Sequence, residues 1–213
     1  MAISKAELLH RQLPLLLTIV CLVLVAAVLL GWGLGVEVLV RGASGRAAMV
    51  PGTAIALALL FLGLLLHLMQ EHAQDKVIFC AAAAAMVVLT NSVVVALDPA
   101  GLDALLKSRA PRDRMSPGTM TGLLSGALGL AGLGSARLLR REVPMLAALS
   151  GLSGIIAVLA VHNFRLGAPL SLPFVSAMSI YTALCLLAFN AALLLVSLAP
   201  SASSRVPESH ADG

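Results

Sequence analysis

The feature that most constrains this sequence is a short frame that occurs three times, each time at the start of a long apolar run. The frame is a methionine, a residue two positions on that is proline in the first two copies, and a threonine four positions on. It occurs at Met49-Val-Pro51-Gly-Thr53, at Met115-Ser-Pro117-Gly-Thr119 and, without the proline, at Met178-Ser-Ile-Tyr-Thr182. The copies lie about 65 residues apart, which indicates an internal repeat. Because proline suits the first position of a helix, the frame predicts three helix starts.

The composition places these helices in a membrane. Hydrophobic residues make up 60% of the chain and charged residues 11%, and the mean hydropathy is +1.01. Soluble domains contain about 45–50% apolar and about 25% charged residues. The net charge of +4 lies in short connections between apolar runs, which suits membrane lipids as partners and gives no support to nucleic-acid binding.

Six apolar runs approach the roughly 20 residues that a helix needs to cross a bilayer. We expect spans at about 15–34, 50–69, 77–97, 117–133, 144–161 and 172–198. The first run is longer than the core of a cleaved signal peptide, so it is interpreted as a span. Residues 1–13 form a polar lead, residues 14–199 the transmembrane domain, and residues 200–213 a disordered polar tail. Between the third and fourth spans, leucines at helical spacing in 98–114 predict a short helix on the membrane surface.

Six spans pair as three hairpins, each an approach helix followed by a helix that the frame opens. Two crossings per hairpin give every copy the same orientation, as in parallel transporter repeats. The predicted fold is therefore an all-α integral membrane protein with six transmembrane helices in three parallel-repeat helical hairpins. The starts of the second, fourth and sixth helices then share one side of the bilayer. If they converge, their positive dipole ends form an anion or headgroup site; three independent helix starts are the alternative. The helix-start residues are Met49, Pro51, Thr53, Met115, Pro117, Thr119, Met178 and Thr182.

The orientation rests on a weak signal, because the 14 Lys and Arg residues divide evenly between the two sides. The basic lead before the first span, and Arg137, Arg140 and Arg141 directly after the fourth, favour cytoplasmic termini. We expect a multi-pass protein of the bacterial inner membrane with both termini in the cytoplasm.

Small residues at one-turn spacing in the fourth and fifth spans predict close helix packing, since they let backbones approach each other. Asn91, in the third span, is interpreted as a hydrogen-bonding residue between helices, worth about 1 kcal/mol, rather than as a ligand-binding group. The candidate packing residues are Gly122, Gly126, Gly129, Gly151, Gly154 and Asn91.

The spans lack the residues that chemistry in a membrane requires. No Asp, Glu, Lys or Arg lies in the middle of a predicted span, which disfavours coupled transport. His67 and His162 fall at opposite faces in the preferred topology, so they do not form one haem or metal pair. We expect no enzymatic activity, cofactor or metal. The three cysteines lie in apolar runs without CxxC spacing and are interpreted as buried small side chains.

The order of several motifs resembles a known kind of membrane region. Gly31-Trp32-Gly-Leu-Gly35 ends the first span, the two proline-containing frames follow, and Met178 with Thr182-Ala183-Leu opens the last helix. Over about 15–198 this resembles the multi-span amino-terminal region of bacterial sensor histidine kinases and diguanylate cyclases. The resemblance implies membrane anchoring and sensing, with a PAS, kinase or cyclase portion after the last helix. No such motif follows Pro200, so the module is expected to be freestanding or truncated.

Three functions follow from these observations. The first is a sensory or signalling module in which a lipophilic ligand or a bilayer property changes the packing of the hairpins. The second is an accessory or structural subunit of a larger membrane complex. The expected partners are membrane lipids and either further copies of the chain or a larger membrane protein complex. The third is a small transporter of lipophilic substrates, which requires a water-accessible central cavity.

Overall fold

The computed structural model describes residues 12–42, 47–70, 72–97, 115–135, 142–164 and 178–198. These residues form seven helices and no strand: α2 (Leu13–Leu34), α3 (Glu37–Arg41), α4 (Pro51–Met69), α5 (Gln74–Leu97), α7 (Pro117–Gly134), α8 (Glu142–Phe164) and α9 (Ile180–Leu198). The all-helical prediction is confirmed for this part of the chain. The lead before residue 12, the predicted surface helix at 98–114 and the tail at 200–213 lie outside it.

Five of the seven helices, α2, α4, α5, α8 and α9, are long and apolar enough to cross a membrane. The predicted membrane character is therefore supported. The helix at the predicted fourth span, α7, is not among the five, because its glycines and threonines lower its apolar content. The helix at the predicted sixth span begins at Ile180, well after Leu172, and Met178 and Ser179 before it are not helical.

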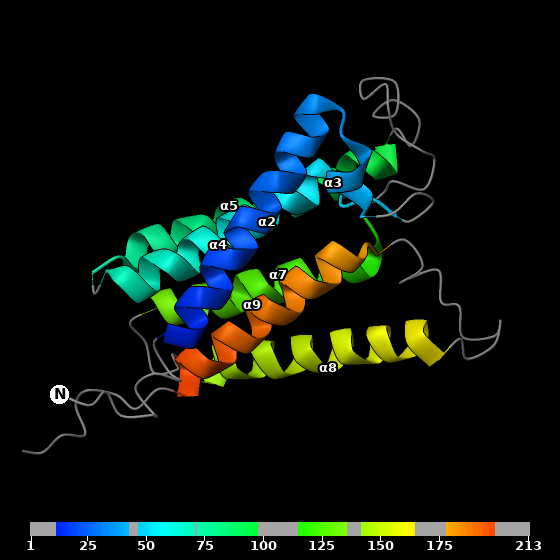
Figure 1. The fold of residues 1–213 in the computed structure, drawn as a ribbon. Coiled ribbons are helices and arrows are strands. Elements are labelled where there is room, and N and C mark those ends of the chain that lie inside the picture. Colours follow the sequence, from blue (N-terminus) through cyan, green and yellow to red (C-terminus); the bar gives the residue numbers. More distant parts are fainter. Residues whose placement is uncertain are drawn as a thin grey trace, which may run out of the picture.

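The long helices form an inner and an outer set (Figure 1). The inner helices α4, α7 and α9 all contact one another. Each outer helix packs against two inner helices: α2 against α4 and α9, α5 against α4 and α7, and α8 against α7 and α9. The inner helices are those that the repeated frame opens, and the outer helices are those that precede them in the chain.

The two sets run in opposite directions. In Figure 1 the starts of α4, α7 and α9 lie at the end of the bundle where α3 is found, and the starts of α2, α5 and α8 lie at the other end. Three helix starts far apart in the sequence therefore lie at one end of the bundle.

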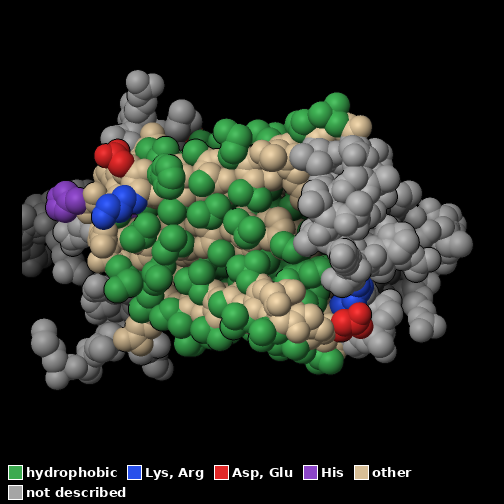
Figure 2. Space-filling model, turned by 90° about the horizontal axis from the view of Figure 1, so that it is seen from above, with side chains coloured by type: hydrophobic (Ala, Val, Ile, Leu, Met, Phe, Trp, Pro, Cys, Tyr) green, Lys and Arg blue, Asp and Glu red, His purple; other side chains and the backbone are tan. Residues whose placement is uncertain are grey.

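The outer surface is apolar along its length. Large hydrophobic side chains are exposed on the outer helices, among them Val23, Phe79, Met86 and Ile156. Figure 2 shows hydrophobic side chains across the middle of one face, with the charged side chains near its two ends. Such a belt suits contact with lipid acyl chains.

Candidate functional site: three helix starts around a filled core

The second and third copies of the frame begin their helices with the same hydrogen bonds. The backbone N–H of Thr119 donates to Ser116 Oγ over 3.2 Å, and that of Thr182 donates to Ser179 Oγ over 3.1 Å. In each pair the serine and threonine hydroxyls are also 2.9 Å apart. The serine that follows each methionine is therefore an N-cap, which satisfies one of the N–H groups that a helix start leaves unpaired.

The first copy has the same backbone geometry without the side-chain cap. Val50 precedes α4 with φ −67° and ψ 150°, close to the −69° and 151° of Ser116 before α7. The first helical hydrogen bonds match as well. Ala54 N donates to Val50 O over 3.1 Å, Met120 N to Ser116 O over 3.0 Å, and Ala183 N to Ser179 O over 3.0 Å.

Most side chains of the frame face the interior. Met49, Met115 and the three threonines are buried, with exposed fractions between 0% and 5%, whereas Met178 and Pro51 are half-buried and Pro117 is exposed. The N–H groups of Thr119 and Thr182 already donate to serine oxygens. These two helix starts therefore do not offer those groups to an anion, and the frame acts in packing and capping.

Replacing either capping serine with alanine should destabilise the protein. The expected loss for Ser116→Ala or Ser179→Ala is about 0.5–2 kcal/mol of unfolding free energy, since each change leaves a buried N–H without its partner. Ser153→Ala is the control, because that exposed serine donates only to Leu149 O within its own helix. Equal losses at all three positions in an equilibrium unfolding titration in bicelles would contradict the capping role.

The repeat continues beyond the frame into the core. Four residues after the frame threonine, all three inner helices have a fully buried leucine: Leu57, Leu123 and Leu186. Eleven residues after it they do so again: Leu64, Leu130 and Leu193. Spacings of four and seven residues return to one helix face, so these leucines form two layers of equivalent positions between α4, α7 and α9.

The layer between them, seven residues after the threonine, combines Leu60, Gly126 and Phe189. A Cβ atom on Gly126 would lie 3.0 Å from Phe189 Cε1 and 3.3 Å from Leu60 Cδ1. The ring of Phe189 also meets Phe61 edge-on, with centroids 5.6 Å apart at 84°. The glycine thus makes room for the phenylalanine, and side chains fill the centre between the inner helices at all three layers.

The predicted packing glycines differ in their surroundings. An added Cβ would lie 3.1 Å from Leu186 at Gly122 and 2.7 Å from Leu193 at Gly129, so both glycines permit close contact between α7 and α9. At Gly154 no atom lies within 4 Å, and this glycine is exposed. Asn91 Nδ2 would lie 3.0 Å from a Cβ on Gly52, which places Asn91 of α5 against the first turn of α4.

Sequence reasoning missed Asn190, the most unusual polar group of the core. Asn190 is fully buried in α9, and its Nδ2 donates to Leu186 O over 2.8 Å. Its Oδ1 has no hydrogen-bond partner among the residues that the structure describes. The amide lies against the backbone of α8 at Gly151, where an added Cβ would be 2.5 Å from Asn190 Cγ. An amide side chain inside the last apolar run was the signal that could have revealed it.

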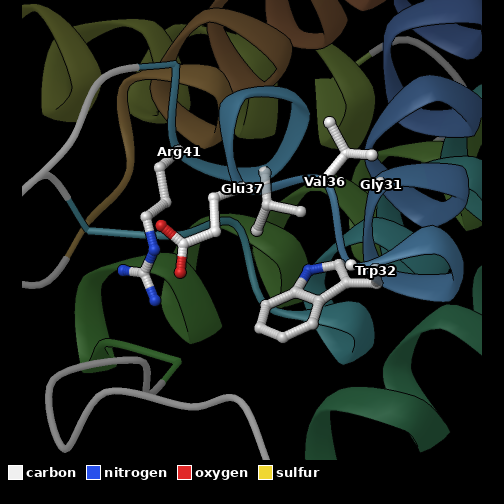
Figure 3. A pocket seen from close by; sticks show the side chains of 7 residues that line it. Gly31, Trp32, Val36, Glu37 and Arg41 are labelled. Carbon is white, nitrogen blue, oxygen red and sulfur yellow. The ribbon is translucent and has the colours of Figure 1, made fainter.

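A second unpredicted feature is the pocket formed by the last turn of α2 and the short helix α3. Gly35, with φ 69°, ends α2, and Val36 N donates to Gly31 O over 2.8 Å, which turns the chain into α3. A Cβ on Gly31 would lie 2.7 Å from Leu39 Cβ, so only glycine at this position lets α3 lie so close to α2. Trp32, Glu37 and other side chains line the pocket (Figure 3).

This pocket is joined to two of the inner helix starts. Trp32 Nε1 donates to Met49 O over 2.8 Å, and Met49 N donates to Val40 O over 3.2 Å. Beyond α3, a Cβ on Gly42, with φ 72°, would lie 2.8 Å from Tyr181 Oη. The segment of α2 and α3 thus contacts the frame before α4 and the first turn of α9.

The three cysteines are buried and free. The thiol of Cys21 in α2 lies beside that of Cys185 in α9. Among the described residues, no group of three or more His, Cys, Asp or Glu side chains could hold a metal ion.

No protein-family model matches the chain, and no characterised protein or solved structure is significantly similar to it.

Proposed function

We propose that this chain is a membrane-embedded sensory or signalling module made of three parallel hairpins, α2–α4, α5–α7 and α8–α9. In this proposal α7 also crosses the membrane, as the fourth of six spans. The equivalent leucine layers and the placement of each outer helix between two inner ones support a threefold repeat. A glycine-rich helix is suited to lipid when its neighbours approach closely, because its backbone hydrogen bonds are internal.

The observation that carries the signalling role is the unpaired side-chain amide oxygen, Oδ1, of Asn190. Buried polar atoms are almost always hydrogen-bonded, and each exception calls for an explanation. In the α8–α9 interface this oxygen lies against the backbone of α8 at Gly151. An interface with one unsatisfied acceptor is one that a different arrangement of the same helices can improve.

Donors for that oxygen are available on α8. Ser150 Oγ donates to Ala147 O over 3.0 Å and Ser153 Oγ to Leu149 O over 2.8 Å, both within the helix. A rotation of α8 about its axis would bring one of these hydroxyls toward Asn190 and shift α9. A lipophilic ligand or a bilayer property with different affinity for the two packings would then change their populations.

Distance measurements between spin labels test this proposal. Labels at Met86→Cys on α5 and Ile156→Cys on α8, both exposed, report the position of α8 after the native cysteines are replaced with alanine. We expect two distance populations whose ratio changes with bilayer thickness, and one population in Asn190→Ala. A single distance that is the same in both proteins and in every bilayer would overturn the proposal.

The second candidate function is an accessory subunit of a larger membrane complex. It is favoured by the outer face of α8, where small side chains are exposed: Ser150, Ser153, Gly154 and Ala157. Such faces suit close approach of another helix. Stoichiometric co-purification of a partner that Gly154→Leu abolishes would favour this function over signalling, and purification of the chain by itself would count against it.

A further inference from the structure

The pocket between α2 and α3 has the position of a site at the membrane surface. Val36, Val38 and Leu39 are exposed apolar side chains around α3, with exposed fractions of 40%, 68% and 38%. Glu37 and Arg41 lie one turn apart on the other face of this helix. A short helix with apolar side chains on one face and charges on the other lies in the interfacial layer, where tryptophan is also enriched.

The two charged side chains are placed together in this pocket. Figure 3 shows the Glu37 carboxylate and the Arg41 guanidinium directed toward one another beside the Trp32 ring. Positions one turn apart on a helix place their Cβ atoms about 5–6 Å from each other. The pocket therefore presents one negative group, one positive group and an aromatic wall within the length of a small zwitterion.

We propose that this pocket binds the headgroup of a zwitterionic phospholipid that carries a primary ammonium and a phosphate, as in phosphatidylethanolamine. Arg41 contacts the phosphate, since guanidinium is suited to phosphate oxygens. Glu37 accepts hydrogen bonds from the ammonium. The two-carbon link between ammonium and phosphate matches the one-turn spacing of the two side chains.

The same pair of charges selects against anionic lipids. A phosphatidylglycerol headgroup has a phosphate for Arg41 but no ammonium for Glu37, so the Glu37 carboxylate repels the phosphate and no ammonium offsets that repulsion. The attraction of that phosphate to Arg41 and its repulsion by Glu37 then largely cancel.

The pocket is also connected to the inner helices. The ring of Trp32 is held by its hydrogen bond to Met49 O, at the first residue of the frame that opens α4. A bound headgroup therefore packs against an indole that already fixes the start of an inner helix. Lipid binding does not depend on the proposed signalling role, and the experiment below measures binding alone.

The tryptophan fluorescence of the native chain reports on this pocket, because Trp32 is its only tryptophan. The full chain is reconstituted in bilayers that contain dibrominated phosphatidylethanolamine or dibrominated phosphatidylglycerol at equal fractions in unlabelled phosphatidylcholine. Bromine quenches tryptophan fluorescence at contact distance. We expect quenching to give an apparent affinity about three- to tenfold higher for the ethanolamine lipid.

Variants of Glu37 and Arg41 test whether the preference for the ethanolamine lipid arises in this pocket. Glu37→Gln and Arg41→Gln should each reduce the preference to near unity, whereas Glu142→Gln and Lys76→Gln, at exposed charges on other helices, should leave it unchanged. An unchanged Trp32 emission maximum in unbrominated bilayers shows that a variant keeps the pocket intact, and Arg41→Lys provides a milder change. No preference in the native chain, or an equal preference in all variants, would overturn the proposal.

A soluble amine phosphate has the same chemistry as the headgroup, so a final arm separates the two sources. Millimolar phosphoethanolamine added to the vesicles should leave the quenching by brominated ethanolamine lipid unchanged. Recovery of the fluorescence would overturn the lipid assignment in favour of a soluble ligand.

Discussion

Replacing Gly151 with alanine should destabilise the bundle far more than the same replacement at Gly154, three residues further along α8. A Cβ at Gly151 would lie 2.5 Å from Asn190 Cγ and 2.7 Å from Nδ2, whereas no atom lies within 4 Å of one at Gly154. Overpacking costs about 1–3 kcal/mol. If Asn190 is pushed away from Leu186 O, its buried amide also loses a hydrogen bond, which costs a similar amount. We expect a loss of about 2–4 kcal/mol of unfolding free energy for Gly151→Ala.

Equilibrium unfolding in bicelles measures this difference. Gly154→Ala should change the unfolding free energy by less than about 0.5 kcal/mol, as is usual for exposed positions. Asn190→Ala in the Gly151→Ala background removes the obstructing amide, so the double variant should recover part of the loss. Similar effects at the two glycines, or no recovery in the double variant, would show that this contact does not hold α8 against α9.

Exchanging the side chains of Gly126 and Phe189, which occupy one core layer, should give the second large effect on the unfolding free energy. Gly126→Phe alone forces a ring into space that Phe189 and Leu60 occupy, at a cost of about 3 kcal/mol. Phe189→Gly alone leaves a cavity, whose cost in lipid comes mainly from lost packing contacts. Because the two positions are equivalent in the repeat, the double variant restores the volume of the layer. We expect a favourable coupling of about 2 kcal/mol between the two substitutions.

A matched pair tests whether the recovery is specific to the layer. Leu128 lies on α7 with 63% exposure, so Leu128→Gly creates no cavity between the inner helices. It should therefore fail to rescue Gly126→Phe in the same unfolding measurement. A double variant Gly126→Phe with Phe189→Gly that loses the sum of the two single losses would contradict the equivalence of these positions.

The sequence predicts helix positions well because two local signals coincide there. Apolar run length sets the spans, and Pro51 and Pro117 stand at the first helical positions of α4 and α7. The third copy has no proline, so its start is less sharply marked, and the run before Met178 extends the predicted span to Leu172. The capping by Ser179 accounts for the start of α9 at Ile180.

Features that depend on contacts between distant segments could not be predicted in this way. The helix α3 forms where Gly31 lets Leu39 approach α2, and the close contact of Asn190 with Gly151 joins two different helices. Tyr181 replaces the glycine of the other two copies and packs on Gly42 of a distant loop. A pattern along the chain locates helices, but it does not say which of their faces meet.

If the chain contains three hairpins of equal orientation in the bilayer, α7 must be a crossing helix. Single cysteines placed in a cysteine-free variant and labelled with a membrane-impermeant maleimide test it directly. The informative positions are exposed: Asp75, Glu142 and Leu198 at one end of the bundle, and Leu97 and Ile180 at the other. We expect the first three to be labelled from one side of the membrane and the last two from the opposite side. Labelling of Leu97→Cys and Glu142→Cys from the same side would mean that α7 does not cross, and would contradict the claim.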